Sequence, residues 1–276
     1  MSRNVMTKRS ESSCSARMIA PLLVLAMLWS CEGQRSIPSG TDIGESAHEA
    51  VESNEFYTLP GLDHGLIQAP VNILTSKTGS ASHEVRFRPG GAGAKQVVNT
   101  GHSVQVDFGA GSTFLYDGRE FAFQQCHFHT PSEHQVDGIT YPMEMHCVNV
   151  RPAPQGSEAP PEYLVLGFLF KMGQESRFIA DFLDQVPNQV ASIALTEGNE
   201  VYLEDLIVEF GGTHRYYSYR GSLTTPPFTE TVNWLVLERI FEASAQQIHT
   251  INQLEGNNAR HVQALYGRQV EVSTEP

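Results

Sequence analysis

Three histidines in the middle of the chain, His127, His129 and His146, have the types and spacing of metal ligands. His127 and His129 are separated by one residue, as in a strand whose alternate side chains share a face. Three neutral imidazoles that leave one coordination position open form a catalytic zinc site, whereas structural zinc is usually closed by four protein ligands. The sequence therefore predicts one Zn²⁺ per chain, in a site able to do chemistry.

Two neighbouring strands are needed to bring these histidines together. The runs 121–129 and 143–150 both show the alternation of a strand, and the segment between them contains turn-forming prolines and a glycine. In each run, alternate side chains share a face: Phe123, Gln125, His127 and His129 in the first, and Glu144, His146, Val148 and Val150 in the second. If the two runs fold as antiparallel neighbours, the three imidazoles can converge.

The residues two positions before His127 and His146 strengthen this prediction. A metal-bound histidine usually donates its other N–H to a carboxylate, an amide or a carbonyl. Gln125 and Glu144 occupy these positions, on the same faces as the ligands. A His-x-His pair alone is often only a surface feature. The second strand with its Glu-x-His pattern strengthens the metal interpretation, and the remaining motifs decide between the two.

The rest of the chain predicts a mainly β fold. Short β-type runs are separated by Gly, Pro, Asn and Asp. Besides the two histidine runs, they cover 83–88, 103–108, 113–117, 163–170 and 231–237. Helical patterns occupy 175–185, 188–195 and 243–254, the last beginning at Ser244 as N-cap and ending near Gly256. We expect short helices around a large, twisted, mostly antiparallel central sheet.

Five ordered blocks of the sequence resemble those of the alpha-class carbonic anhydrases. They are 68–73 (QAPVNI), 99–102 (NTGH), 125–134 (QCHFHTPSEH), 144–146 (EMH) and 219–227 (YRGSLTTPP), with Trp234 following the last. The blocks span most of the predicted domain. The resemblance implies the fold of that family and a lyase activity, the reversible hydration of CO2 to bicarbonate and a proton.

The resemblance also implies how the metal is held and used. His127, His129 and His146 would bind Zn²⁺, and the backbone carbonyl of Asn258 would orient His129. Thr224 would accept a hydrogen bond from zinc-bound hydroxide and donate its own to Glu133. His134 is expected to support Tyr219 or the surrounding loop, not the metal.

The remaining matched residues would handle substrate and proton. CO2 would lie against an apolar wall made of Val148, Val165, Leu223 and Trp234. Thr225 stands where the family contacts bicarbonate, and His102 where it carries a proton shuttle. This chemistry is reasonable, because CO2 is apolar and because histidine has an unperturbed pKa near neutrality. Bound zinc lowers the pKa of water enough to supply hydroxide near neutral pH, carbonic anhydrases being the standard example.

The chain departs from the family pattern at three places, the least consequential being Arg260-His261 where Arg-Pro is usual. An aromatic cluster that usually precedes the first block is missing, which puts the efficiency of proton transfer in doubt. The cysteine pair that commonly cross-links bacterial members is also absent, and Cys126 and Cys147 are a different pair. If His127 lies opposite His146, Cys126 lies opposite Cys147 on the other face of the sheet. They are either buried thiols or a cross-strand disulfide, which an exported protein could form, although directly opposed strand residues make a strained one.

The N-terminal part predicts export. Residues 1–30 hold basic residues followed by an apolar run that is short for a bilayer span, as in a secretory signal. Cys31 ends a sequence that resembles a bacterial lipobox, so lipidation of Cys31 is expected, with plain secretion or a retained anchor as alternatives. Residues 31–54 predict a flexible tether and 55–276 the folded domain. The protein is expected in the periplasm or cell envelope, where a lipid would anchor it to the outer membrane.

Composition limits the partners. The formal net charge of −13 argues against nucleic acid, which requires clustered Lys and Arg. We expect CO2 and bicarbonate as the partners, a membrane contact only through the lipid anchor, and an oligomeric state that the sequence leaves open, with a dimer as one option.

Two other functions remain open at this stage. An inactive binding domain of the same fold would typically lack one or more of the zinc histidines, and all three are present here. A zinc hydrolase acting on esters would need a wider site and an acid for the leaving group, which the sequence does not identify.

Overall fold

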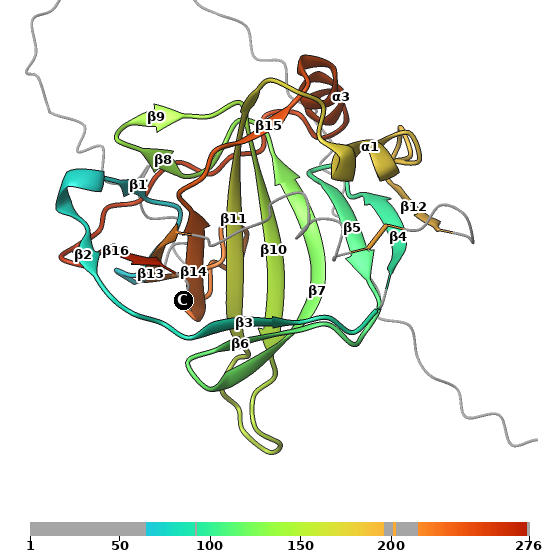
Figure 1. Cartoon of the computed structure of the whole chain (residues 1–276). Coiled ribbons are helices and arrows are strands. Elements are labelled where there is room, and N and C mark those ends of the chain that lie inside the picture. Colours follow the sequence, from blue (N-terminus) through green and yellow to red (C-terminus); the bar gives the residue numbers. More distant parts are fainter. Residues whose placement is uncertain (1–64, 92, 196–200, 203–214, 275–276) are drawn as a thin grey trace, which may run out of the picture. The chain divides into compact units, whose positions relative to one another are not determined.

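The centre of the structure is a large sheet in which the two histidine-bearing strands lie side by side (Figure 1). The computed structural model describes residues 65–91, 93–195, 201–202 and 215–274. Within them the central strands are β7 (Arg119–His129), β10 (Met143–Arg151), β11 (Glu162–Met172) and β14 (Val232–Leu237). β10 pairs antiparallel with both β7 and β11, and β11 pairs parallel with β14.

The described residues form one sheet of 13 strands and a second sheet of three. The three-stranded sheet consists of β1 (Asn72–Ile73), β8 (Gln135–Val136) and β9 (Ile139–Thr140). The other strands of the large sheet are β2 (Gly79–Ser80), β3 (Val85–Arg88), β4 (Ala94–Asn99), β5 (Val104–Phe108), β6 (Thr113–Tyr116), β12 (Ala191–Ala194), β13 (Arg215–Gly221), β15 (Phe241–Ala243) and β16 (Glu271–Thr274). Most pairings are antiparallel, so the predicted fold class is confirmed, with parallel pairs such as β11–β14 making the sheet mixed.

Helices are short, as expected. Those in the described residues are η2 (Thr75–Lys77), α1 (Arg177–Leu183) and α3 (Ala245–Glu255). α3 begins at Ser244, whose side chain accepts from the backbone N–H of Gln247 while the Gln247 side chain accepts from that of Ser244. This reciprocal capping satisfies two backbone donors, and Gly256 with a φ of 71° ends the helix.

The helix predicted at 188–195 is wrong. Residues Ala191–Ala194 form β12, an edge strand that pairs antiparallel with β4. All four of its residues are exposed, and Ile193 is 44% exposed, so no apolar face existed to hold a helix against the core. The free backbone edge of β4 provides the interaction that decides the conformation here.

Phe123 lies on the opposite face from the one predicted. The register between β7 and β10 shifts by one residue between Val148 and Asn149, because Gln125 faces Val148 whereas Phe123 faces Asn149. Such a bulge inserts one residue and reverses the alternation beyond it. Phe123 therefore packs in the same apolar cluster as Cys126, with its ring centroid 4.8 Å from that of Phe108.

Two apolar clusters lie on the two faces of the central strands. One contains Cys126 and Phe128 of β7 and packs against residues of α1 and α3, such as Phe182 and Ile251. The other contains Val165 of β11 and Trp234 of β14. Alternation along the strands separates them, and the histidines project on the side of the second cluster. The site therefore sits on a sheet packed on both faces.

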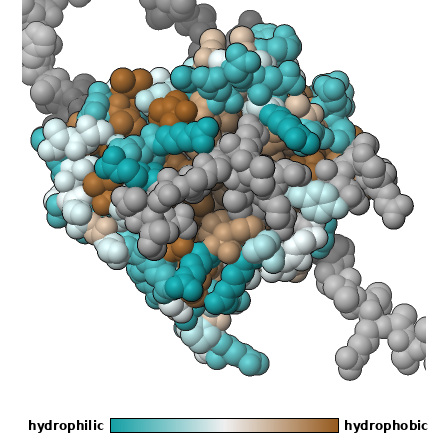
Figure 2. All heavy atoms as spheres, viewed as in Figure 1, coloured by the Kyte–Doolittle hydropathy of each residue, from teal (hydrophilic) through white to brown (hydrophobic). Residues whose placement is uncertain are grey.

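Predictions for the N-terminal part lie outside the described residues. These are the signal peptide at 1–30, lipidation of Cys31, the tether at 31–54 and the start of the domain at 55. Neither α1 nor α3, the helices longer than one turn in the described part, has the length and apolarity to cross a bilayer. On the face shown in Figure 2, apolar side chains occur in small groups separated by hydrophilic ones.

Glu255 ties α3 to the sheet and should make stability depend on pH. Its buried carboxylate accepts from the backbone N–H of Val104 at 3.0 Å and from the Thr130 hydroxyl at 3.0 Å. Burial raises the pKa of Glu255 from 4.5 to about 8, although both hydrogen bonds lower it. Since the folded state holds the proton more tightly, this contribution to stability is complete below pH 4.5 and is lost as the pH rises through about 8.

A Glu255→Gln variant tests this linkage. Glutamine cannot ionise, so the variant should lose less unfolding free energy than the wild type between about pH 5 and pH 8, by at most roughly 1.4 kcal/mol per pH unit. Urea unfolding of both proteins at several pH values measures the difference. Parallel pH profiles for the two proteins would contradict the buried, protonated carboxyl.

Candidate functional site

The pairing of β7 with β10 brings the three predicted histidines together. His127 lies directly opposite His146, and His129 lies opposite Glu144. The imidazole ring centroids are 5.0 Å apart for His127 and His129, 5.2 Å for His127 and His146, and 4.6 Å for His129 and His146. One nitrogen from each ring lies within 4.8 Å of the others. The predicted convergence is therefore present in the structure.

Hydrogen bonds select which nitrogen of two histidines can bind a metal. The Gln125 Oε1 atom lies 2.9 Å from His127 Nδ1, which leaves Nε2 of His127 for a ligand. The Glu144 Oε1 atom lies 2.9 Å from His146 Nε2, which leaves Nδ1 of His146. Both contacts fix the orientation of the imidazole ring, as outer partners of metal ligands do.

His129 has no hydrogen-bond partner at either ring nitrogen among the described residues, although the residue is only 2% exposed. An unsatisfied buried polar group costs about 1–3 kcal/mol, so its presence requires an explanation. A metal ion at the meeting point of the three rings would supply the missing partner. The buried His129 ring, whose nitrogens have no hydrogen-bond partner among the described residues, is the observation that best supports a metal at this position.

The protonation state of the three rings also fits a metal. Burial lowers the pKa of His129 to about 4, and burial together with neighbouring histidines holds the pKa of His127 well below its usual value. Burial likewise lowers the pKa of His146. The neutral imidazole that results is the form that donates a lone pair. Three neutral nitrogens with one position left open match catalytic zinc.

Glu144 is the hub of the buried polar network. Its Oε1 atom contacts both His146 and His134 Nδ1, the latter at 2.7 Å, and its Oε2 atom accepts from the backbone N–H groups of Glu133 and His134. Burial raises its pKa, but the charges and hydrogen bonds of His134 and His146 hold the pKa well below its usual value. Glu144 therefore stays ionised and accepts from both rings.

His134 takes the supporting role predicted for it. It is fully buried, and its Nε2 atom hydrogen bonds with the Tyr219 hydroxyl. Together with Glu144 and His146 it forms a second group of residues that could in principle hold a metal. The hydrogen bonds of Glu144 to both rings account for that grouping, so we assign no second ion to it.

Gly167 of β11 lies opposite His146 on the other side of β10. A Cβ atom at Gly167 would lie 3.0 Å from Glu144 Oε1, closer than ordinary contact. The absence of a side chain there gives the Glu144 carboxylate its place. Sequence reasoning missed this residue, although a glycine inside a strand is a known sign of close approach.

Glu133 lies beside the three rings. Its Oε2 atom is 3.5 Å from His129 Nε2 and 3.8 Å from His146 Nδ1, and its Oε1 atom accepts from the backbone N–H of Arg260 at 2.9 Å. Burial raises its pKa to about 7, against the opposing effects of His146, the Arg260 N–H and the Thr224 side chain. The structure thus brings together the Glu133 and Thr224 pair, and it adds Arg260, which sequence reasoning had not used.

The four apolar residues predicted to hold substrate belong to one cluster. Val148, Val165 and Trp234 form a row across β10, β11 and β14, and Leu223 packs against the same cluster. The Trp234 ring centroid is 4.8 Å from that of His146, and its Nε1 donates to the Ser222 carbonyl at 3.0 Å. Val165 and Trp234 are buried, whereas Val148 and Leu223 are half-buried. Thr225, in the adjoining loop, is exposed.

His102 and Asn258 lie at the end of the histidine strand. His102 is exposed, and its backbone carbonyl accepts from Asn258 Nδ2 at 2.6 Å. The same Nδ2 donates to the Phe128 carbonyl, and Asn258 Oδ1 accepts from the Thr130 N–H. Asn258 thus holds the backbone on both sides of His129, and its backbone and side chain lie near enough to that ring to raise its pKa.

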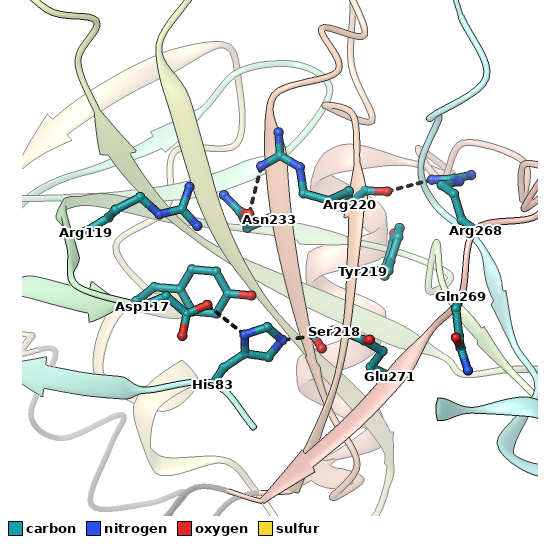
Figure 3. Close-up of a pocket in the computed structure, with 11 residues that line it drawn as sticks. His83, Asp117, Arg119, Ser218, Tyr219, Arg220, Asn233, Arg268, Gln269 and Glu271 are labelled. Carbon is teal, nitrogen blue, oxygen red and sulfur yellow. Dashed lines mark hydrogen bonds and ion pairs between the residues drawn. The ribbon is translucent and has the colours of Figure 1, made fainter. Parts of the chain in front are cut away.

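A separate pocket of about 420 Å³ is lined by none of the three histidines, although Tyr219, the partner of His134, is among its lining residues (Figure 3). Its charged side chains mainly interact with each other or with the backbone: His83 Nδ1 lies 2.7 Å from Asp117, and Arg268 donates to the Arg220 carbonyl at 2.8 Å. Arg220 also donates to Asn233. We place the candidate chemistry at the histidines, where unpartnered nitrogens converge, and not in this pocket.

Comparison with known sequences agrees with the geometry. The profile of the eukaryotic-type carbonic anhydrase family matches residues 59–274. A carbonic anhydrase of Pectobacterium atrosepticum is 33% identical over 248 residues, which cover 89% of this chain and 95% of that protein. A carbonic anhydrase of Neisseria gonorrhoeae is 31% identical over 259 residues, which cover 91% and 96% of the two chains.

Comparison with solved structures gives the same result. The alpha-carbonic anhydrase of Photobacterium profundum superposes with a TM-score of 0.64 at 30% identity, covering 75% of this chain and 89% of that one. The alpha-carbonic anhydrase of Thermovibrio ammonificans, solved with the inhibitor sulfanilamide, gives a TM-score of 0.64 at 32% identity and covers 74% and 86%. The histidine site, the sheet that carries it and these matches together place this chain in the eukaryotic-type, or alpha, carbonic anhydrase family.

Proposed function

We propose that this chain is a zinc-dependent carbonic anhydrase that interconverts CO2 and bicarbonate at the site of His127, His129 and His146. The family and the relatives named carbonic anhydrase support CO2 hydration. The observation that carries the zinc is the buried His129 ring, unpartnered among the described residues, at the meeting point of three neutral imidazoles. Intact ligands argue against an inactive binding domain, and we assign no acid that an ester hydrolase would use.

Zinc, when bound, would supply hydroxide near neutral pH by lowering the pKa of water, the effect for which carbonic anhydrases are the standard example. His127 Nε2, His129 and His146 Nδ1 would hold it. Gln125 and Glu144 orient these rings through hydrogen bonds to the nitrogens that would not bind the metal, Nδ1 of His127 and Nε2 of His146. This support keeps the ligands in place while leaving the fourth position for reactants.

Thr224 and Glu133 would orient the reacting oxygen. In the account proposed here, the Thr224 hydroxyl donates to the Glu133 carboxylate and accepts from the oxygen that attacks CO2. The backbone N–H of Arg260 holds Glu133 Oε1, which leaves Oε2 directed at the histidines. A hydroxyl that donates its own proton to a carboxylate can only accept a hydrogen bond from the attacking oxygen. A lone pair of the attacking oxygen then points at the carbon of CO2.

The apolar row of Val148, Val165 and Trp234, with Leu223, would hold CO2 beside the open coordination position. CO2 offers little to hydrogen bond, so an apolar wall binds it without competing with water for polar partners. Thr225, exposed in the next loop, would contact bicarbonate as it leaves. His102, exposed at the end of the histidine strand, would pass the product proton to buffer, because an imidazole can both accept and release a proton.

We further propose export with lipidation at Cys31, on the basis of the apolar run and the lipobox-like sequence before it. Bicarbonate, CO2 and protons would then be exchanged in the periplasm or cell envelope. Mass spectrometry of the mature protein tests this proposal, since a lipidated Cys31 at the N-terminus supports it and an unprocessed Met1 contradicts it.

The metal assignment is tested by replacing a ligand and a matched histidine elsewhere. In His146→Ala the site keeps only two of its three ligands, so zinc content should fall far below one per chain and CO2 hydration should fall to the rate of chelator-treated protein. His249→Ala, at an exposed position of α3, should leave both unchanged. Elemental analysis and stopped-flow hydration on the same samples measure the two quantities. Full hydration by the His146→Ala protein would overturn the assignment.

The shuttle role of His102 has its own test. His102→Ala should slow hydration by roughly 10²-fold in dilute buffer, because the product proton loses its acceptor, while zinc content stays the same. Adding imidazole should restore much of the rate, because a soluble base can take the proton instead. A rate that is unaffected in dilute buffer would assign proton transfer to another group.

A further inference from the structure

Cys126 and Cys147 form a close pair beneath the histidine site. They face each other directly in the register of β7 and β10, and their Sγ atoms are 2.7 Å apart. Both are thiols in this structure, with exposures of 0% and 2%. Two cysteines distant in sequence therefore meet inside the core, with each sulfur in hydrogen-bonding contact with the other.

The backbone geometry at this pair suits a covalent bond. Facing residues of antiparallel strands have Cα atoms about 4.5–5.5 Å apart, inside the range of about 4.4–6.8 Å found for disulfides. The two side chains already point at each other with their sulfurs in contact, so only a small approach is needed to form the bond.

The surroundings argue against a role in metal binding. Val106 of β5 and Leu166 of β11 flank the pair in the same row of the sheet, and both cysteines belong to the apolar cluster on the face away from the histidines. Neither group of potential metal ligands in the described part of the chain includes a cysteine. Metal binding therefore does not account for the pairing of these two thiols.

We propose that Cys126 and Cys147 form a disulfide when the protein folds under oxidising conditions, and that this bond fixes the register of the two strands that carry the metal site. Cys126 precedes His127 and Cys147 follows His146, so the cross-link lies one residue from each of two directly opposed ligands. A slip of one strand against the other, which would send these histidines to opposite faces, is then prevented covalently.

The oxidant is a small or protein disulfide. One cysteine thiolate attacks a sulfur of the donor, forming a mixed disulfide and releasing one donor thiolate. The second cysteine thiolate then displaces the other donor thiolate. The S–S bond between Cys126 and Cys147 forms, the donor S–S bond breaks, two electrons pass to the donor, and the two cysteine protons end on its thiols. Because both sulfurs are buried, the exchange takes place before β7 and β10 close, or when they open.

A thiol count on the full chain tests the bond itself. The protein is unfolded and refolded in a mixture of oxidised and reduced glutathione, then alkylated in denaturant and digested. We expect a peptide pair linked through Cys126 and Cys147, distinguished by its mass from products of Cys14 and Cys31. Cys147→Ala should abolish the link. Recovery of Cys126 and Cys147 as two alkylated thiols in the folded wild type would overturn the proposal.

Stability and metal retention test its consequence. The bond closes a loop between residues 21 apart, so reducing it should lower the melting temperature by about 5–10 °C. A Cys126→Ala/Cys147→Ala variant should melt at the same temperature with and without reductant. The oxidised protein should also release zinc more slowly than the reduced protein. That expectation rests on the proposed zinc site, whereas the thiol count does not. Identical melting temperatures of the oxidised and reduced wild type would refute the proposal that the bond fixes the register of the two strands.

Discussion

The antiparallel register between β7 and β10 decides where every group of the site lies. Because His127 faces His146, the pairing of the neighbouring residues is fixed. His129 faces Glu144 on the same side of the sheet, and Cys126 faces Cys147 on the other side. A shift by one residue would turn each histidine toward the wrong face. Flanking strands continue the same rows, which is why Gly167 leaves space beside His146 and Glu144, and why Val148, Val165 and Trp234 form a continuous wall.

Burial gives these groups their chemical character. Removed from water, the three imidazoles are held neutral, and neutral imidazole is the form that binds a metal. The same burial would penalise the Glu144 carboxylate, but its interactions with the rings of His134 and His146 keep its pKa low. Glu133 receives a single backbone N–H at Oε1, and its pKa rises to about 7. Two neighbouring carboxyls thus differ in character, because two histidine rings offset burial at Glu144 whereas burial dominates at Glu133.

Much of this could be predicted from the sequence, since strand periodicity places alternate residues on one face. The convergence of His127, His129 and His146, the partners Gln125 and Glu144, and the contact between Cys126 and Cys147 all follow from two paired strands. Features that depend on more than alternation could not be foreseen. The bulge that turns Phe123 away depends on how β7 meets β10, β12 forms because β4 offers a free edge, and the place of Asn258 depends on the approach of a distant loop.

Metal removal and return tests the central claim most directly. Chelator-treated full-length protein should show negligible CO2 hydration, and zinc added back in steps should restore the rate linearly until one ion is bound per chain. Binding should release few protons above pH 7, because burial already holds His127, His129 and His146 neutral. Rapid hydration by the metal-free protein, or one bound zinc without any hydration, would contradict the account of this site.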